Sequence, residues 1–444
     1  MMPAADQEVA SEVKWVDGTQ IAAWYGLRFA SLVTRFQPAK KAEGRLEVKA
    51  LHEVPVFPQL KSRLSSSMGL GSPNPQSEDA FFLNIWAPAQ AKQLPVLVFI
   101  HGGAWMTGGS ALPWYDGARL AAQGIVVINI NYRLGALGHL GTAADCSLPV
   151  PAHDVLLALE WIAEHVGQYG GDAAHVTLAG QSAGGWYAHL LSVLPRTAHL
   201  MQRVALLSMG TRAPWSAQQQ AATTSRATAI AGNLLTAQAQ QVLTAGLQAL
   251  EPAPFQLGYA PAAFLPVASQ DVPTPLFDPT WAAQHCHAKK VYIRYTKDES
   301  ASFFFDLPEY AQLTQDQVDA ALMQWPSQNL PAVLLREGEF EGKRSGLSPY
   351  EQLVAASSWL QFQRFPQHYA QQLQSLGKDV SLRRFNLASP LARLQSGHCF
   401  DLPFQFGVRA AWEGAPMLAG LDESTFEKEA SSLINELAQF VKSE

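Results

Sequence analysis

The chain has 444 residues, 48% of them hydrophobic and 15% charged, so it can bury a large core and is too apolar for a disordered protein. Its net charge of −6 at pH 7 gives no indication of a nucleic-acid groove or of binding to an anionic membrane surface. No apolar stretch approaches the ~18–20 residues that span a membrane. These properties predict a globular protein that has neither a nucleic acid nor a membrane as its partner.

Cysteine usage and the first residues favour the cytoplasm. The cysteines Cys146, Cys286 and Cys399 are an odd number and lack the CxxC spacing of many metal sites. A secreted protein of this size more often carries paired cysteines, so a reducing compartment is expected. The opening segment MMPAADQEVASEV has no basic region followed by an apolar one and does not resemble a signal peptide. We therefore expect a cytoplasmic protein.

Strand-like and helical segments alternate along the chain. Short apolar runs in the first 60 residues predict small strands, and the Ser/Gly/Pro-rich residues 60–77 predict a loop. Continuous apolar runs then alternate with segments of helical periodicity such as 150–169, which predicts a mostly parallel sheet covered on both faces. The expected strands of that one sheet are 94–100, 125–130, 176–180, 204–210, 291–295 and 380–386.

The middle of the chain has a different composition. Residues 216–250 are rich in Ala and Gln, and residues 307–377 lack strand-like runs, so both regions predict helices. The tail at 424–442 has the pattern of an amphipathic helix. We expect residues 1–444 to form a single α/β domain, in which helical insertions around 216–270 and 307–377 decorate one sheet.

A GxSxG motif, GQSAG at 180–184, has Ser182 at its centre. It follows the expected strand VTLAG and precedes the helical segment AGGWYAHLL. A strand-to-helix turn this tight needs small flanking residues, strains the serine backbone and lifts the hydroxyl above the sheet. It also places the helix N-terminus, with its unpaired N–H groups, behind the hydroxyl. Ser182 is therefore the candidate nucleophile, and the context disfavours a Gly-rich turn with an inert serine.

A second glycine-rich motif, HGGA at 101–104, directly follows an expected strand. Glycines let the backbone approach a ligand closely, and N–H groups aimed at a developing oxyanion stabilise it. Taken alone, the motif is also compatible with an ordinary turn at the end of a strand. Together with a serine elbow roughly 80 residues later, it matches the oxyanion loop of lipases and esterases.

A serine nucleophile needs a histidine base, and in hydrolases with this elbow the histidine follows the serine in the chain. His189 and His199 lie within or just beyond the helix that leaves the elbow, so they cannot easily fold back onto Ser182. His398 lies in a glycine-bearing loop beyond the strand at 380–386, where a loop at the top of the sheet belongs. His398 is therefore the candidate base.

The base in turn needs a carboxylate that orients it. Asp298 and Glu299 both follow the strand at 291–295, at the carboxyl end where such residues gather. The residues by themselves do not distinguish the two, and either could be a surface carboxylate. The tripeptide HCH at 285–287 suggests metal binding, but no further ligands accompany it, so no metal or cofactor is expected.

The motifs and their surroundings resemble the type B carboxylesterases, the family of para-nitrobenzyl esterases and cholinesterases. SEDAFFLNIWAP at 77–88 resembles the family segment SEDCLYLNVYTP, HGGAW resembles HGGGF, and YTKDES resembles GTNKDEG. NYRLGALGHLG at 131–141, the segment 153–185 and GHCFDLPFQFG at 397–407 also follow the family. These matches cover nearly the whole chain in the family order and imply an α/β-hydrolase fold.

The resemblance implies catalytic roles for Ser182 as nucleophile, Glu299 as orienting acid and His398 as base. The oxyanion-hole donors of the family correspond to Gly103, Ala104 and Ala183, with Gly102 shaping the loop. The resemblance also implies two structural ion pairs, Arg35–Glu78 and Arg133–Asp154.

Several residues depart from the family pattern. Phe57 and Ala80 stand where the family has a disulfide, in agreement with a reducing compartment. Gln181 replaces the Glu that usually precedes the nucleophile, which removes a negative charge near the pocket, and the loop lacks the Trp that cholinesterases place under a quaternary ammonium. Choline esters are therefore not expected as preferred substrates. Ser300 and Asp401 also differ from the family but are not expected to touch the triad.

The sequence thus predicts a serine carboxylesterase that acts on a small-molecule ester through an acyl-enzyme intermediate, without a cofactor. Trp105, Gln181 and Trp186 are expected around the substrate pocket, where apolar side chains favour acyl or aryl esters. One alternative is a thioesterase or amidase on the same triad. Another is a non-catalytic cholinesterase-like binding module, although such modules typically lack the nucleophile. The oligomeric state is not indicated.

Overall fold

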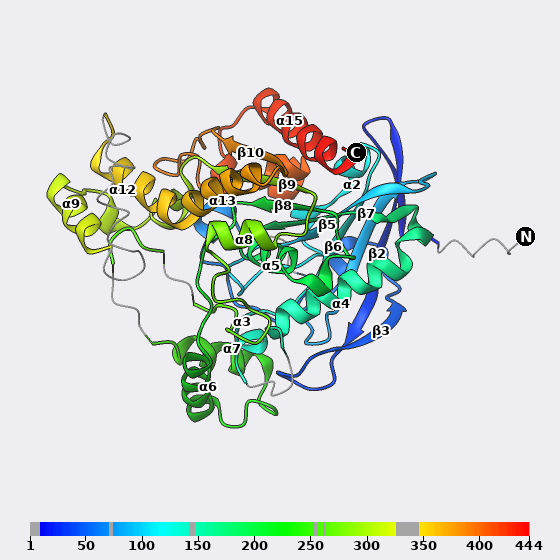
Figure 1. Cartoon of the computed structure of the whole chain (residues 1–444), viewed down its shortest axis with the longest axis horizontal. Helices are drawn as coiled ribbons and strands as arrows, with labels where there is room; N and C mark the ends of the chain where they lie inside the picture. Colours follow the sequence, from blue (N-terminus) through cyan, green and yellow to red (C-terminus); the bar gives the residue numbers. More distant parts are fainter. Residues whose placement is uncertain are drawn as a thin grey trace, which may run out of the picture.

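One ten-stranded mixed sheet runs through the described part of the chain (Figure 1). The structure is a computed structural model that describes residues 9–70, 74–141, 147–251, 256–260, 263–325 and 346–443. The strands are β1 (Glu12–Val16), β2 (Thr19–Ser31), β3 (Lys40–Arg45), β4 (Phe82–Pro88), β5 (Leu94–Ile100), β6 (Val126–Ile130), β7 (Gly171–Gln181), β8 (Arg203–Leu207), β9 (Lys290–Thr296) and β10 (Asp379–Phe385). Their order is β1-β2-β4-β6-β5-β7-β8-β9-β10, and β3 pairs with β2.

The strands from β5 to β10 pair in parallel with one another, whereas β1 to β4 pair antiparallel, and β4 joins the two parts by pairing antiparallel with β6. Every residue of β6 (VVINI) and of β8 (RVALL) is buried, as expected for parallel strands that are covered on both faces. The predicted fold class is therefore confirmed. β8 ends at Leu207, earlier than predicted, because Ser208 turns the chain with a φ of 45°.

Helices cover both faces of the sheet (Figure 1). α2 (Ala118–Ala121) and α15 (Glu423–Lys442) lie on one face, and α4 (Val150–His165), α5 (Ala183–Ser192) and α8 (Pro279–His285) lie on the other. The predicted tail helix is confirmed as α15: Asp422 caps it by accepting a 2.8 Å hydrogen bond from the Thr425 N–H, and Phe426, Leu433 and Leu437 are buried along one side.

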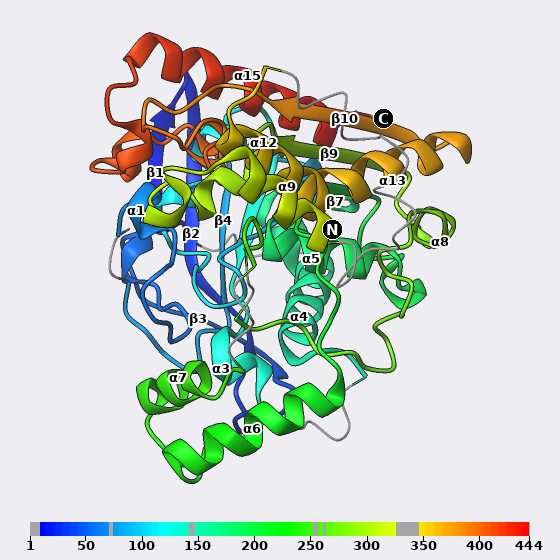
Figure 2. The same cartoon turned by 90° about the vertical axis from the view of Figure 1, so that its left-hand side faces the viewer.

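Further helices occupy both regions that were predicted to be helical. α6 (Ala217–Ala231) and α7 (Ala239–Gln248) lie with α3 (Gly135–His139) around a second, smaller apolar core (Figure 2). α9 (Gln315–Gln324) and α12 (Pro349–Ser358) enclose a third. α12 continues through a π-helical turn, Trp359–Gln363, into α13 (Arg364–Ser375), which packs against α8 and β10. The short helices α1 (Ser65–Met68) and α14 (Leu402–Phe406) complete the set in these ranges.

The N-terminal part differs from the prediction of small strands. β2 is 13 residues long and pairs with β1, β3 and β4. It stays continuous because Gly26, with a φ of 66°, absorbs an irregularity where the β4 register shifts between Trp24 and Leu27. The region at 60–77, which was predicted to be a loop, contains the short helix α1. Cys146 lies outside the described residues.

Both predicted ion pairs are confirmed. Arg35 Nη2 lies 2.5 Å from Glu78 Oε1, and Arg133 Nη2 lies 2.6 Å from Asp154 Oδ1. The Arg133–Asp154 pair is buried, and the Asp154 carboxylate also accepts from the Arg133 backbone N–H at 3.1 Å. It therefore fixes the segment after β6 to α4. In the described ranges, no helix combines the length and the apolar character that crossing a lipid bilayer requires.

Candidate active site

The candidate residues gather at one edge of the sheet. β5 ends at Ile100, just before the HGGA motif, and β7 ends at Gln181, just before Ser182. β9 ends at Thr296, three residues before Glu299, and β10 leads into the loop that carries His398. Because these strands are parallel, their carboxyl ends meet at the same edge, which is where open α/β sheets bind ligands.

Ser182 occupies a strained turn between β7 and α5. Its φ of 54° and ψ of −117° are unfavourable for a residue with a side chain, and its N–H donates to the Leu207 carbonyl at 2.9 Å. The flanking glycines are sterically required: a Cβ on Gly180 would lie 2.2 Å from the Gly184 oxygen, and one on Gly184 would lie 2.2 Å from the Ile100 oxygen. The chain thus holds the Ser182 hydroxyl at the N-terminus of α5.

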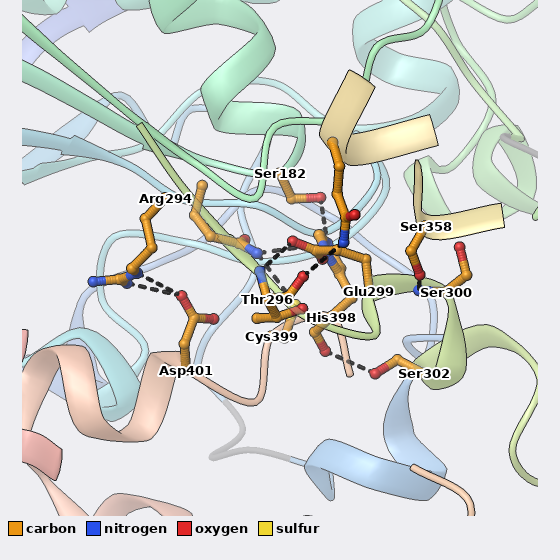
Figure 3. A network of polar contacts seen from close by, with 12 residues as sticks. Ser182, Arg294, Thr296, Glu299, Ser300, Ser302, Ser358, His398, Cys399 and Asp401 are labelled. Carbon is orange, nitrogen blue, oxygen red and sulfur yellow. Dashed lines mark hydrogen bonds and ion pairs between the residues drawn. The ribbon is translucent and has the colours of Figure 1, made fainter. Parts of the chain in front are cut away.

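Ser182, His398 and Glu299 form a continuous chain of hydrogen bonds (Figure 3). The His398 Nε2 atom lies 2.8 Å from Ser182 Oγ, and His398 Nδ1 lies 2.5 Å from Glu299 Oε2. Because a carboxylate only accepts, Nδ1 carries the proton, and Nε2 is left to accept from the serine hydroxyl. The second Glu299 oxygen accepts from the Thr296 N–H at 2.8 Å, which fixes the carboxylate.

The surroundings of His398 determine its charge. His398 as a residue is 3% exposed, and burial by itself disfavours the charged imidazole. The contacts with Cys399 and with the Glu299 carboxylate outweigh burial and raise the pKa of His398 well above its ordinary value. The site therefore stabilises an imidazolium at this position.

The Asp298 carboxylate is hydrogen-bonded to Ser396 and not to His398. Its Oδ2 accepts from the Ser396 N–H at 3.3 Å, and its own N–H donates to the Ser396 carbonyl at 2.9 Å. Burial raises the pKa of the Asp298 carboxyl. Asp298 therefore tethers the loop that carries His398, whereas Glu299 contacts the imidazole itself.

Three backbone N–H groups belong to the loops beside Ser182: Gly103 and Ala104 line the same cavity as Ser182, and Ala183 follows it as the first residue of α5. Within the described ranges, the N–H groups of Gly103, Ala104 and Ala183 donate to no other protein group. Gly103 has a φ of 110°, and a Cβ on it would lie 1.9 Å from the Thr107 oxygen, so only glycine fits there. A Cβ on Gly102 would likewise lie 2.1 Å from Gln181 Oε1. This arrangement can bind an oxyanion.

His101, which we did not single out from the sequence, supports this loop. Burial lowers the pKa of His101 to about 4, against a smaller opposing effect of its hydrogen bond to the Gly102 oxygen. The neutral ring stacks on Tyr132, with 4.5 Å between the ring centroids, and the Tyr132 hydroxyl donates to the His101 carbonyl at 2.8 Å. The sequence did contain a signal for this role, because His101 is the first residue of the HGGA motif.

A cavity of about 310 Å³ opens onto Ser182 and His398. Gln181 and Phe303 are among its lining residues. Trp105 and Trp186 are buried, pack edge to face with ring centroids 6.5 Å apart, and are not among the described lining residues. The pocket role that we expected for these two tryptophans therefore stays a prediction.

Gln181 and Cys399 meet beside the imidazole. Gln181 Nε2 donates to Cys399 Sγ at 3.3 Å and lies 3.5 Å from His398 Nε2. Cys399 has a φ of 70°, a conformation that favours glycine. The Gln181 side chain is neutral, whereas a Glu at this position would place a second carboxylate, in addition to Glu299, near the His398 imidazole.

Two further contacts were not expected from the sequence (Figure 3). Arg294 on β9 and Asp401 form a buried ion pair with an Nη2–Oδ2 distance of 2.8 Å. The Ser300 N–H donates to Ser358 Oγ of α12 at 2.9 Å, so α12 braces the turn that carries Glu299. In each of these two pairs, the partners lie far apart in the sequence, and no sequence motif links them.

No group of three or more potential metal ligands occurs among the residues that the structure describes.

Comparisons with known proteins agree with this geometry. The model of the carboxylesterase family matches residues 10–443. A probable N-octanoylanthranilate hydrolase of Rhodococcus erythropolis is 29% identical over 420 residues, which cover 90% of this chain and 84% of the relative. The phenmedipham hydrolase of Pseudarthrobacter oxydans is 28% identical over 462 residues, which cover 99% of this chain and 85% of the relative. A solved PNB esterase is similar in fold, with a TM-score of 0.79 at 24% identity, and covers 97% of this chain and 88% of its own.

Proposed function

The chain belongs to the carboxylesterase family and is a carboxylic ester hydrolase, and we propose that it cleaves esters through Ser182, His398 and Glu299. The observation that carries this proposal is the hydrogen-bonded order Ser182–His398–Glu299, in a cavity that Gly103 and Ala104 also line. A nucleophile, a base and an oriented acid in this arrangement are what acyl transfer requires.

In the first half-reaction, His398 Nε2 takes the proton of the Ser182 hydroxyl while Oγ attacks the ester carbonyl. The N–H groups of Gly103, Ala104 and Ala183 bind the tetrahedral oxyanion. Glu299 holds the imidazole in the required tautomer and stabilises the imidazolium. His398 then protonates the departing alcohol, and the acyl group remains on Ser182.

In the second half-reaction, water replaces the alcohol. His398 takes a proton from the water, which attacks the acyl carbon, and the oxyanion is bound by the same N–H groups. Collapse of this intermediate breaks the bond to Ser182 Oγ, and His398 returns the proton to the serine. In this proposal the small ester is the only partner, and no nucleic acid, membrane or cofactor takes part.

A cytoplasmic location is also proposed. It is supported by Phe57 and Ala80, which pack in the apolar core where family members place a disulfide, and by the free thiols of Cys286 and Cys399.

The test is fluorophosphonate labelling of the purified protein, followed by identification of the modified residue. We expect the label on Ser182, and we expect Ser182→Ala to lose both labelling and hydrolysis of a short para-nitrophenyl ester. Labelling at another residue, or full hydrolysis by the variant, would refute the mechanism. The name of the Rhodococcus relative describes an N-octanoyl substrate, so N-acyl compounds belong in the same assay. Thioesters belong there too, because a thioesterase would use the same three residues.

A further inference from the structure

A π-helical turn brings an aromatic side chain against the His398 imidazole. Phe362, from the turn Trp359–Gln363 between α12 and α13, is buried, and its ring centroid lies 4.9 Å from that of the His398 ring. Phe303, four residues after Glu299, lies 5.5 Å from the same ring. The two phenylalanine rings are nearly parallel, with 6.1 Å between their centroids and 8° between their planes. The imidazole is therefore packed against two neighbouring aromatic rings.

Hydrogen bonds fix the π-helical turn on both sides of Phe362. The Thr211 N–H, in the segment after β8, donates to the Gln361 carbonyl at 3.1 Å. Gln363 Nε2 donates to the carbonyl of Thr296, the last residue of β9, at 3.1 Å. The turn is thus tied to the carboxyl ends of two strands of the sheet. π-helical turns of this kind are rare and often occur at functional sites.

The same helical segment is bonded to the turn that carries Glu299. Gln361 Nε2 donates to Ser357 Oγ at 2.6 Å. Ser357 Oγ in turn donates at 2.7 Å to the hydroxyl of Ser300, the residue after Glu299. These side chains are buried, so water does not compete for their hydrogen bonds. Phe362 therefore keeps a fixed position relative to the carboxylate that anchors the imidazole.

Polar contacts hold the two nitrogens of the imidazole unequally. Glu299 Oε2 anchors Nδ1 at 2.5 Å, and Ser182 Oγ lies 2.8 Å from Nε2. Gln181 Nε2 lies 3.5 Å from His398 Nε2, which is the outer limit of a hydrogen bond, and the Cys399 thiol is a weak hydrogen-bonding group. The orientation of Nε2 therefore depends on Ser182 and on the packing of the ring.

The proposed reaction removes the Ser182 contact at its midpoint. In the acyl-enzyme, Ser182 Oγ carries the acyl group and has no proton to donate to His398 Nε2. Water must then give its proton to Nε2 while the water oxygen bonds to the acyl carbon, and this proton passes to Ser182 Oγ when the bond to the acyl group breaks. A base that moves out of line slows such a step, so ring packing matters most in this half-reaction.

We propose that Phe362 is a positioning residue for deacylation, which holds the His398 imidazole in place while Ser182 is acylated. Phe303 supports Phe362 through the stacked contact of the two rings. The inference rests on the proposed function, because it concerns the second half-reaction of the same three residues.

The experiment measures the ratio of acylated to unacylated protein during steady-state hydrolysis. The protein is mixed with a saturating short para-nitrophenyl ester and quenched with acid, and the intact masses are determined. This ratio equals the acylation rate constant divided by the deacylation rate constant, so an equal loss in both steps leaves it unchanged. We expect Phe362→Ala to slow deacylation about tenfold and acylation much less, and therefore to raise the ratio severalfold.

Two further variants separate packing against the imidazole from general damage. Phe362→Leu retains part of the apolar volume and should raise the ratio less than Phe362→Ala. Phe365→Ala is the matched control, because Phe365 is buried in α13 and its ring packs against His189 and Phe277. It removes a buried ring from the same helical segment and should leave the ratio unchanged.

An unchanged or lower ratio in the Phe362 variants would overturn this inference, and so would an equal rise in Phe365→Ala. Phe362→Leu carries the test if Phe362→Ala does not fold, which the melting temperatures show. Failure of the proposed function is distinguishable, because the wild-type protein would then not be labelled by a fluorophosphonate at Ser182.

Discussion

Asp298 and Glu299 are neighbours in the chain, but their carboxylates have different partners. Glu299 reaches His398 Nδ1 at 2.5 Å, and Asp298 Oδ2 accepts from the Ser396 N–H at 3.3 Å. Glu299 is fully buried and opens a short 3-10 turn, Glu299–Phe303, whose first residue is turned toward the imidazole. We therefore expect substitutions of these two residues to have different effects on catalysis, although both residues contact the loop that carries His398.

We expect Glu299→Gln to lower kcat by about 10³- to 10⁴-fold, because the amide neither stabilises the imidazolium nor enforces the tautomer of His398. Asp298→Asn should keep most of the activity, because the amide oxygen can still accept from Ser396. Steady-state kinetics on a short para-nitrophenyl ester measure both, and the melting temperatures show whether each variant is folded. The opposite ranking would reassign the orienting acid.

The second prediction concerns the pH dependence of the reaction. His398 must be neutral to accept the Ser182 proton, so activity is lost as the pH falls through the pKa of His398. Because the structure raises this pKa, we expect the acid limb of kcat/KM above the ordinary histidine value of about 6.5. A pH profile on a neutral ester measures the limb, and a limb well below that value would contradict the role of Glu299.

Gln181 offers a matched variant for the same measurement. Gln181→Glu would bring a carboxylate to the position of an amide that now lies 3.5 Å from His398 Nε2. The added negative charge favours the imidazolium and should move the acid limb to higher pH.

At the scale of elements, the buried Arg133–Asp154 pair joins the segment after β6 to α4. The Arg133 Nη1 atom also donates to the Gln37 carbonyl at 2.6 Å, so the pair fixes three segments of the chain. Removal of one partner leaves the other charge buried and unpaired, which is the costly case for an interior ion pair.

We expect Asp154→Ala to lower the free energy of unfolding by about 3–5 kcal/mol. Denaturant unfolding followed by circular dichroism measures this loss. The control is Glu164→Ala on the same helix, which removes a surface pair with Lys41 at 2.8 Å and should cost less than about 1 kcal/mol. Equal losses for the two variants would mean that the pair at Arg133 adds no more stability than a surface contact.

At the scale of the whole molecule, we propose that the chain forms one domain. The sheet is continuous from β1 to β10, and α12 of the second helical region hydrogen-bonds to the turn that carries Glu299. Cooperative unfolding is the behaviour expected of such a connected structure.

Urea unfolding should therefore follow the same curve by tryptophan fluorescence, by far-UV circular dichroism and by loss of esterase activity. The 12 tryptophans of the chain make the fluorescence signal sensitive to many regions. Two separated transitions, with activity lost in the first, would indicate that the helical regions unfold as a unit of their own.

The sequence by itself determined the parts of this protein that depend on local pattern. Continuous apolar runs marked β5 and β6, because strands buried on both faces contain few polar residues. The GQSAG segment placed Ser182 in a strand-to-helix turn, because such a turn tolerates only small neighbours.

Only the tertiary structure decided which side chains meet across the sheet. It placed the Glu299 carboxylate, which the residues alone had not distinguished from Asp298 and which only the family resemblance had implied, against the imidazole, and it paired Arg294 with Asp401. These partners come from segments far apart in the chain, and their distances depend on how strands and helices pack. Burial then determines what each contact does to a charge, and burial is a property of the packed molecule rather than of any local segment.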